Sequence, residues 1–145
     1  MYFVDVNKLD KKLKYFDQKL TLYHDMTYNT ELDKLALERL AHVLIETILD
    51  IGNMMIDGFV MRDPGSYADI ITILVDEKVL TQAEEDAYQT LINTRKNLVS
   101  DYENVDHASI QLILDKNFKI YEQFSQKIRK YLENETGVAN TFRED

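Results

Sequence analysis

Apolar residues recur every three or four positions through most of this chain, which is the period of an amphipathic α-helix. The longest such stretch, 31–61, contains two glycines and no proline. Its apolar positions cover well over half of the helix circumference, whereas an ordinary surface helix has an apolar face of about 100° or slightly more. We therefore expect a central helix that other helices cover on several sides. Its remaining polar residues form one narrow ridge: Arg39, His42, Glu46, Asp50, Asn53 and Asp57.

The same periodicity predicts four further helices. The first occupies about 6–23, and a short helix follows the Asp63-Pro64-Gly65 break at about 66–75. The third starts at a capping box, in which Thr81 and Glu84 each satisfy a free backbone N–H of the other, and it extends to about 102. The last helix starts after Asp106 and ends near Gly137.

These elements predict an all-α fold, an antiparallel up-and-down bundle of four long helices plus one short helix. The pattern shows no repeat and no linker, so residues 1–137 are expected to form one domain. Residues 138–145 are expected to form a flexible tail.

Composition narrows the function classes. The chain has no cysteine, which excludes a disulfide scaffold, a thiolate metal site and a cysteine nucleophile. Its net charge of −9 argues against broad non-specific nucleic-acid binding, because such binding depends on a basic surface, but a small local basic site stays compatible. No apolar run approaches the roughly 18 residues of a membrane span and nothing resembles a signal peptide, so we expect a cytoplasmic protein without membrane contact.

Arg95 is the most unusual position in the pattern. It shares one side of its predicted helix with apolar and aromatic residues, namely Tyr88, Leu91, Ile92, Leu98, Val99 and Tyr102. Burying a guanidinium without a partner is costly, so it needs a carboxylate, a phosphate or water. The structural interpretation is an ion pair with the acidic ridge of the central helix, or a side chain whose aliphatic part is buried while its guanidinium reaches water. The functional interpretation is a phosphate-binding group.

Three motifs now suggest a family. Asp50-Ile51-Gly52-Asn53 lies on the long helix, Pro64-Gly65-Ser66-Tyr67 opens the short helix, and Arg95-Lys96-Asn97-Leu98-Val99-Ser100-Asp101-Tyr102 ends the next. In order, spacing and chain length, these resemble the HepT-like branch of the HEPN domains. The resemblance implies an α-helical bundle that forms a homodimer. It also implies a metal-independent ribonuclease that acts as a toxin on an RNA substrate and is paired with a nucleotidyltransferase antitoxin.

The family signature is an arginine, often followed by asparagine, then a histidine four to six positions later and, in this branch, a tyrosine two residues after it. Arg95 and Tyr102 match, whereas Ser100 stands at the histidine position and Lys96 stands where asparagine is common. The family histidine is thought to move protons at the 2′-hydroxyl or the leaving oxygen, a role that suits a group titrating near neutrality. A serine needs a neighbouring base to do so.

Two hypotheses follow for the catalytic pair Arg95 and Ser100. In the favoured one, nuclease activity is weakened or lost, and dimerisation and partner binding remain. In the other, Arg95 still stabilises the phosphate and another group replaces the histidine. His107 lies outside the motif spacing. A non-catalytic helical dimer that serves as a protein-interaction module is the alternative from a different class.

The resemblance also implies roles around Arg95. Asp50 and Asn53 are expected to line the same cleft together with Lys96 and Asn97, with Asp50 orienting the guanidinium. Tyr102 stands where the partner nucleotidyltransferase is thought to add AMP; the simpler interpretation is a tyrosine that closes the helix end. We expect no cofactor and no metal site, because the chain lacks the Glu-x-x-His elements of di-iron bundles. The two Arg95 side chains of a homodimer are expected near its axis.

Overall fold

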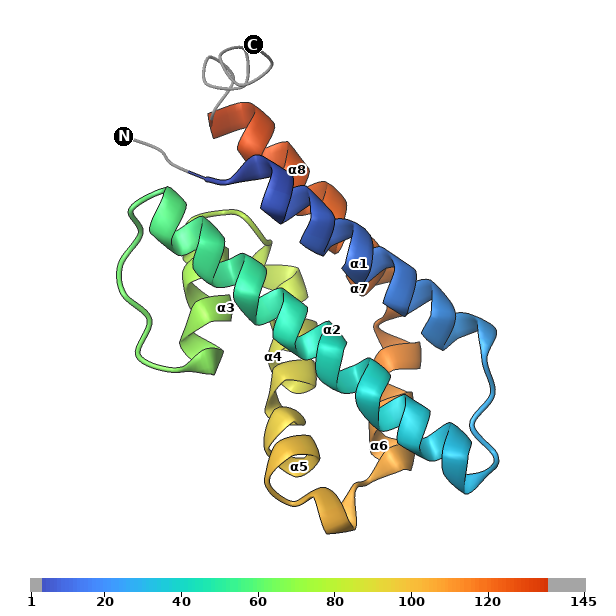
Figure 1. Ribbon diagram of the computed structural model, residues 1–145. Coiled ribbons are helices and arrows are strands. Elements are labelled where there is room, and N and C mark those ends of the chain that lie inside the picture. The colour runs from blue at the N-terminus through green and yellow to red at the C-terminus, as the bar shows by residue number, and fades with distance from the viewer. Residues whose placement is uncertain (1–3, 136–145) are drawn as a thin grey trace.

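The computed structural model describes residues 4–135, which form eight α-helices and one 3-10 helix, with no strand among them (Figure 1). The all-α prediction is confirmed, whereas the predicted tail, 138–145, lies outside the described residues. The elements in chain order are α1 (Val6–Asp25), α2 (Glu31–Gly58), α3 (Tyr67–Asp76), α4 (Gln82–Asn93), α5 (Arg95–Val99), η1 (Tyr102–Asn104), α6 (His107–Lys116), α7 (Phe118–Glu122) and α8 (Phe124–Glu135).

Helix α2 is the central element, as its wide apolar surface predicts. It packs against α1, α3, α5 and α6, and Figure 1 shows α1 lying antiparallel along it. Its fully buried side chains include Leu37, Ile45, Ile48 and Met55. The helix starts at a capping box in which Thr30 Oγ1 accepts a hydrogen bond from Asp33 N at 3.1 Å, and Asp33 Oδ2 accepts one from Thr30 N at 3.0 Å.

The two later long helices are segmented, which the apolar pattern does not predict. The stretch 82–102 is interrupted at Thr94, whose Oγ1 donates to Leu91 O at 2.7 Å. The stretch 107–135 is interrupted at Asn117, whose Nδ2 donates to Ile113 O at 3.2 Å, and again at Gln123. Short polar side chains can compete with helical backbone bonding in this way. As a result, Arg95 is the first residue of a separate five-residue helix, α5.

Helix α3 is held close to α2 at two points. A Cβ built on Gly52 would lie 2.5 Å from Ile70 Cγ2, so only glycine permits this approach. The loop before α3 is closed by Arg62, which bonds to both carboxylate oxygens of Asp69, and Gly65 N also donates to Asp69 at 2.9 Å. These contacts place Tyr67, the first residue of α3, beside α5.

Candidate functional site

Arg95 lies against the polar ridge of α2. Its Nε donates a hydrogen bond to Glu46 Oε1 at 2.5 Å, and its Cζ lies 4.5 Å from the ring centroid of Tyr67. The hydrogen bond with Glu46 raises the pKa of Arg95 further above its usual range, so the guanidinium stays charged. Of the alternatives left open for Arg95, the structure shows the ion pair with a carboxylate of the acidic ridge.

The pairing leaves part of the guanidinium open. Tyr67 covers one face of the group and Nε is hydrogen-bonded, but the two Nη atoms donate no hydrogen bond to any of the residues that the structure describes. No buried side-chain nitrogen of the described residues lacks a partner, so these unpaired Nη atoms reach solvent and are accessible to a ligand. Because the planar guanidinium can bind two oxygens of a phosphate at once, an arginine held through Nε presents an oriented anion-binding edge.

His42 lies one turn before Glu46 on α2. Its Nε2 is 3.8 Å from Glu46 Oε1, the same oxygen that accepts the bond from Arg95. Glu46 thus lies between a permanent cation and an imidazole that is 30% exposed. His42 belongs to the predicted ridge, but sequence reasoning gave it no role, because the search for a histidine followed the spacing of the family motif.

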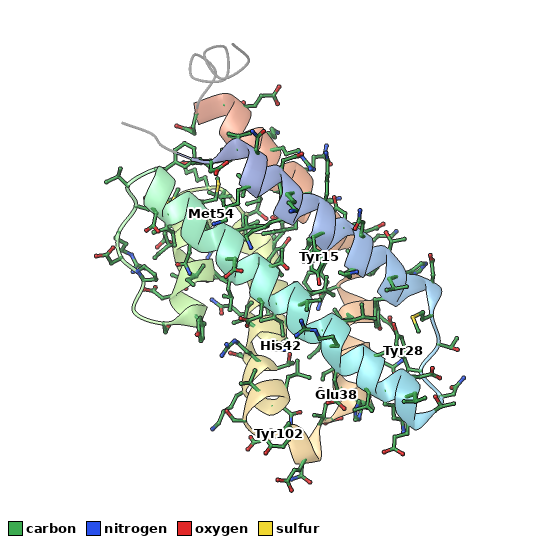
Figure 2. All side chains as sticks on the ribbon, in the orientation of Figure 1. Tyr15, Tyr28, Glu38, His42, Met54 and Tyr102 are labelled. Atoms are coloured by element: carbon green, nitrogen blue, oxygen red, sulfur yellow. The ribbon has the colours of Figure 1, made fainter. Side chains whose placement is uncertain are left out.

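A second histidine contacts the same helix. His107, at the start of α6, lies with Nε2 2.8 Å from Glu38 Oε2, and Glu38 is four residues before His42. Figure 2 shows Glu38 and His42 following one another along α2. Among the described contacts, His107 is linked to Glu38, whereas His42 shares Glu46 with Arg95. His42 is therefore the histidine associated with the arginine.

The predicted cleft residues of α2 have other surroundings. Asp50 Oδ2 pairs with Lys12 Nζ at 3.4 Å, so the carboxylate that orients Arg95 is Glu46 and not Asp50. Asn53 is exposed and makes no hydrogen bond within the described part of the chain. The reason is axial position, since at 1.5 Å per residue these side chains start roughly 6 and 10 Å further along α2 than Glu46.

The remaining motif residues lie in and just beyond α5. Ser100 caps the end of α5 in an exposed position, and its N–H donates to Lys96 O at 2.8 Å, while the Lys96 side chain is exposed. Asn97 closes the following turn, because its amide donates to Asp101 O and Asn104 O and accepts from Asp106 N at 3.0 Å. Asn97 is thus a structural residue of this turn.

Tyr102 lies on η1, in the loop between α5 and α6 (Figure 2). Tyr102 is 64% exposed. Arg95 is therefore the only member of the predicted catalytic and modification set, Arg95, Ser100 and Tyr102, for which the described residues show a contact with α2.

In residues 4–135, no group of three or more histidine, aspartate or glutamate side chains is arranged to hold a metal ion. None of the described helices is both long and apolar enough to cross a membrane.

Known proteins share this sequence and this architecture. The family described as "Ribonuclease HepT-like" matches residues 9–128. The protein named "Putative RNase YutE", from Bacillus subtilis (strain 168), is 46% identical over 144 residues, which cover 99% of this chain and 100% of that protein. A solved structure of YutE from Bacillus subtilis, described as a cytosolic protein of unknown function, superposes with a TM-score of 0.92 at 48% identity, covering 94% of this chain and 96% of that one. On these matches, the chain belongs to the HepT-like ribonuclease family.

Proposed function

We propose that this protein is a metal-independent endoribonuclease whose site consists of Arg95, Glu46 and His42. The observation that carries the proposal is the half-engaged guanidinium: Glu46 fixes Arg95 through Nε, its Nη atoms stay open, and His42 lies beside the same carboxylate. The family and a relative named as an RNase supply the reaction class. The cytosolic description of the YutE structure is consistent with a cytoplasmic location for this chain, which stays a prediction.

The chemistry assigns one role to each group. The 2′-hydroxyl oxygen attacks the adjacent phosphorus, the bond from phosphorus to the 5′-oxygen breaks, and a 2′,3′-cyclic phosphate and a 5′-hydroxyl result. His42 takes the 2′-hydroxyl proton, and the departing 5′-oxygen receives a proton from water. Arg95 donates from its Nη atoms to the non-bridging oxygens as negative charge develops on them. Glu46 positions Arg95 and compensates its charge.

The test is cleavage of a mixed RNA pool in the presence of EDTA. Wild-type protein is expected to release fragments with 2′,3′-cyclic phosphate ends, and Arg95→Ala is expected to release none while staying folded. Ser100→Ala is the matched control, because Ser100 lies outside the proposed site, and it should cleave like the wild type. Equal cleavage by wild type and Arg95→Ala, or none by either, would contradict the proposal.

A second candidate function, a non-catalytic dimeric interaction module, is supported by exposed apolar side chains around the same region. Tyr67, Val99 and Tyr102 are exposed although each carries a large apolar group. When such groups form one contiguous patch, they are typical of a surface that a partner covers. We propose that a homodimer covers them and places its two Arg95 residues near the axis. Sedimentation at micromolar concentration should show a dimer, and a monomer would contradict this proposal.

We further propose that a nucleotidyltransferase antitoxin silences the protein by adding AMP to Tyr102. The exposure of this side chain supports the idea, because a transferase needs access to the hydroxyl. Incubation with the cognate nucleotidyltransferase and ATP should add the mass of one AMP to the wild type and nothing to Tyr102→Phe. No added mass, or an addition that persists in Tyr102→Phe, would contradict it.

A further inference from the structure

A groove of about 800 Å³ lies between α1 and α2, away from the motif that defines the family. Residues of α2 form one wall, and residues from the first three turns of α1 form the other. Figure 2 shows Tyr15 on α1 beside α2. Four of the lining residues are lysines, namely Lys8, Lys11, Lys12 and Lys14.

This groove is locally basic in an acidic chain. Its lining holds four lysines and three carboxylates, those of Asp10, Glu46 and Asp50, a net charge of +1, although the whole chain carries −9. Lys12 pairs with Asp50 at 3.4 Å and Lys14 with Asp10 at 3.0 Å. Lys8 and Lys11, by contrast, are exposed, and neither forms an ion pair with any described residue. Two ammonium groups are therefore free for an anionic ligand.

The groove shares one residue with the proposed site. Glu46 lines it and also accepts the hydrogen bond from Arg95 Nε. A polyanion in the groove would thus extend from the free lysines of α1 toward the open edge of Arg95. Along α1, the lining from Asn7 to Gln18 covers roughly 16 Å at 1.5 Å per residue, a length that suits an extended strand better than one small anion.

Tyr15 adds a feature that a simple anion site does not need. Its ring lines the groove and is 39% exposed, and Lys19 Nζ lies 5.0 Å from the ring centroid. Proteins that bind single strands combine a positive groove for the backbone with aromatic rings on which bases stack. An exposed tyrosine among lysines matches that combination.

We propose that the groove between α1 and α2 binds the backbone of single-stranded RNA and leads it to Arg95. The identity of the ligand rests on the proposed ribonuclease function. The binding itself does not, because it is set by Lys8, Lys11 and Tyr15, which lie outside the catalytic group. A phosphate chain neutralises the free lysines, and one base stacks on Tyr15.

The experiment measures the affinity of the full chain for a single-stranded 2′-O-methyl oligonucleotide, which cannot be cleaved by 2′-hydroxyl attack. Affinity is followed between about 50 and 200 mM salt for wild type, Lys8→Ala/Lys11→Ala and Lys116→Ala/Lys119→Ala. The last variant is the matched control, because Lys116 and Lys119 are exposed, lie outside the groove and carry the same charge. Circular dichroism confirms that each variant is folded.

We expect the groove variant alone to lose affinity, on the order of tenfold at low salt, and its salt slope to fall by about 1.4, or 0.7 for each lost phosphate contact. Tyr15→Leu should weaken oligonucleotide binding at least about fivefold and leave polyphosphate binding unchanged. Equal binding by the groove and control variants would overturn the proposal. So would equally tight binding of polyglutamate, which would indicate a docking site for an acidic protein.

These outcomes are separable from those of the cleavage test. Binding that depends on Lys8 and Lys11 without cleavage by the wild type would remove the proposed function and keep the groove. Cleavage that depends on Arg95, with oligonucleotide binding insensitive to Lys8 and Lys11, would keep the function and remove the groove.

Discussion

Two arginines flank α3, and the structure uses them in opposite ways. Arg62 engages both ends of its guanidinium, with Nη1 at 2.6 Å and Nη2 at 2.7 Å from the two oxygens of Asp69, although its side chain is 53% exposed. Arg95 is less exposed, at 25%, yet it donates only through Nε. The more accessible arginine therefore has a saturated fork, with both Nη atoms paired, and the less exposed arginine has both Nη atoms open.

The difference separates a structural ion pair from a binding group. No buried side-chain nitrogen of the described residues lacks a partner, so the unpaired Nη atoms of Arg95 reach solvent, whereas those of Arg62 are already paired. For Arg62 the saturated fork closes a loop and fixes the start of α3. For Arg95 the free edge is the part that a phosphate would occupy. Four substitutions test this difference between Arg62 and Arg95, and they follow in order of decreasing expected effect.

His42→Ala should reduce RNA cleavage most, by roughly 10²- to 10⁴-fold, which is the usual contribution of a positioned general base. His107→Ala is the matched control, because His107 also contacts a glutamate of α2 but shares none with Arg95. Initial cleavage rates of the two variants would decide. A larger loss of cleavage in His107→Ala than in His42→Ala would contradict the assignment of His42 as the general base.

Arg95→Lys keeps the charge but removes the planar fork, so cleavage should fall by about 10²- to 10³-fold, as when a transition-state donor is lost. Arg62→Lys makes the same change at the saturated pair and should leave the cleavage rate within about twofold of the wild type. The comparison requires both variants to be folded at the assay temperature. An Arg95→Lys variant with full activity would mean that only charge matters at this position.

Gly52→Ala should destabilise the fold that places Tyr67 beside Arg95. The new methyl group would lie 2.5 Å from Ile70 Cγ2, and overpacking of this kind costs about 1–3 kcal/mol, partly offset by the better helix propensity of alanine, roughly 1 kcal/mol. Gly65→Ala is the control, since its Cβ would meet Asp69 only at 3.8 Å. Denaturant unfolding measures both free energies, and equal stability would show that α3 can shift freely.

Asp69 gives the smallest effect, a pH dependence. The hydrogen bond from Arg62, with help from Gly65 N, lowers the pKa of Asp69 to about 2. Because this folded-state pKa is below the unfolded value of about 3.9, the stabilisation is complete above that value and is lost as the pH falls toward 2. Thermal melts of wild type and Asp69→Asn should therefore converge below about pH 4. Curves for wild type and Asp69→Asn that stay parallel down to about pH 2 would contradict this pH dependence.

Much of the fold could be predicted from the apolar pattern. The width of the apolar face identified α2 as central, and local hydrogen-bonding signals such as Thr30 and Thr81 marked helix starts. The breaks at Thr94 and Asn117 could not be predicted, because a one-turn change in backbone bonding leaves the same side chains on the same face.

The site was predictable only in part. A charged residue inside an apolar stripe pointed to Arg95 and to a ridge carboxylate as its partner. The choice of Glu46 over Asp50 depends on how α2 and α5 are offset along their axes, which tertiary packing such as that at Gly52 sets. Glu46 and Arg95 are 49 positions apart, so no motif spacing could have found the histidine beside them.

The most direct test of the contrast is side-chain ¹⁵N NMR of the two arginines during titration with a 2′-O-methyl dinucleotide, which binds without being cleaved. The Nη resonances of Arg95 should shift and those of Arg62 should stay in place, because both Nη atoms of Arg62 already donate to Asp69, whereas neither Nη atom of Arg95 has a partner among the described residues. Shifts at Arg62 alone, or none at Arg95 at saturating dinucleotide, would contradict the claim that Arg95 is the phosphate-binding group.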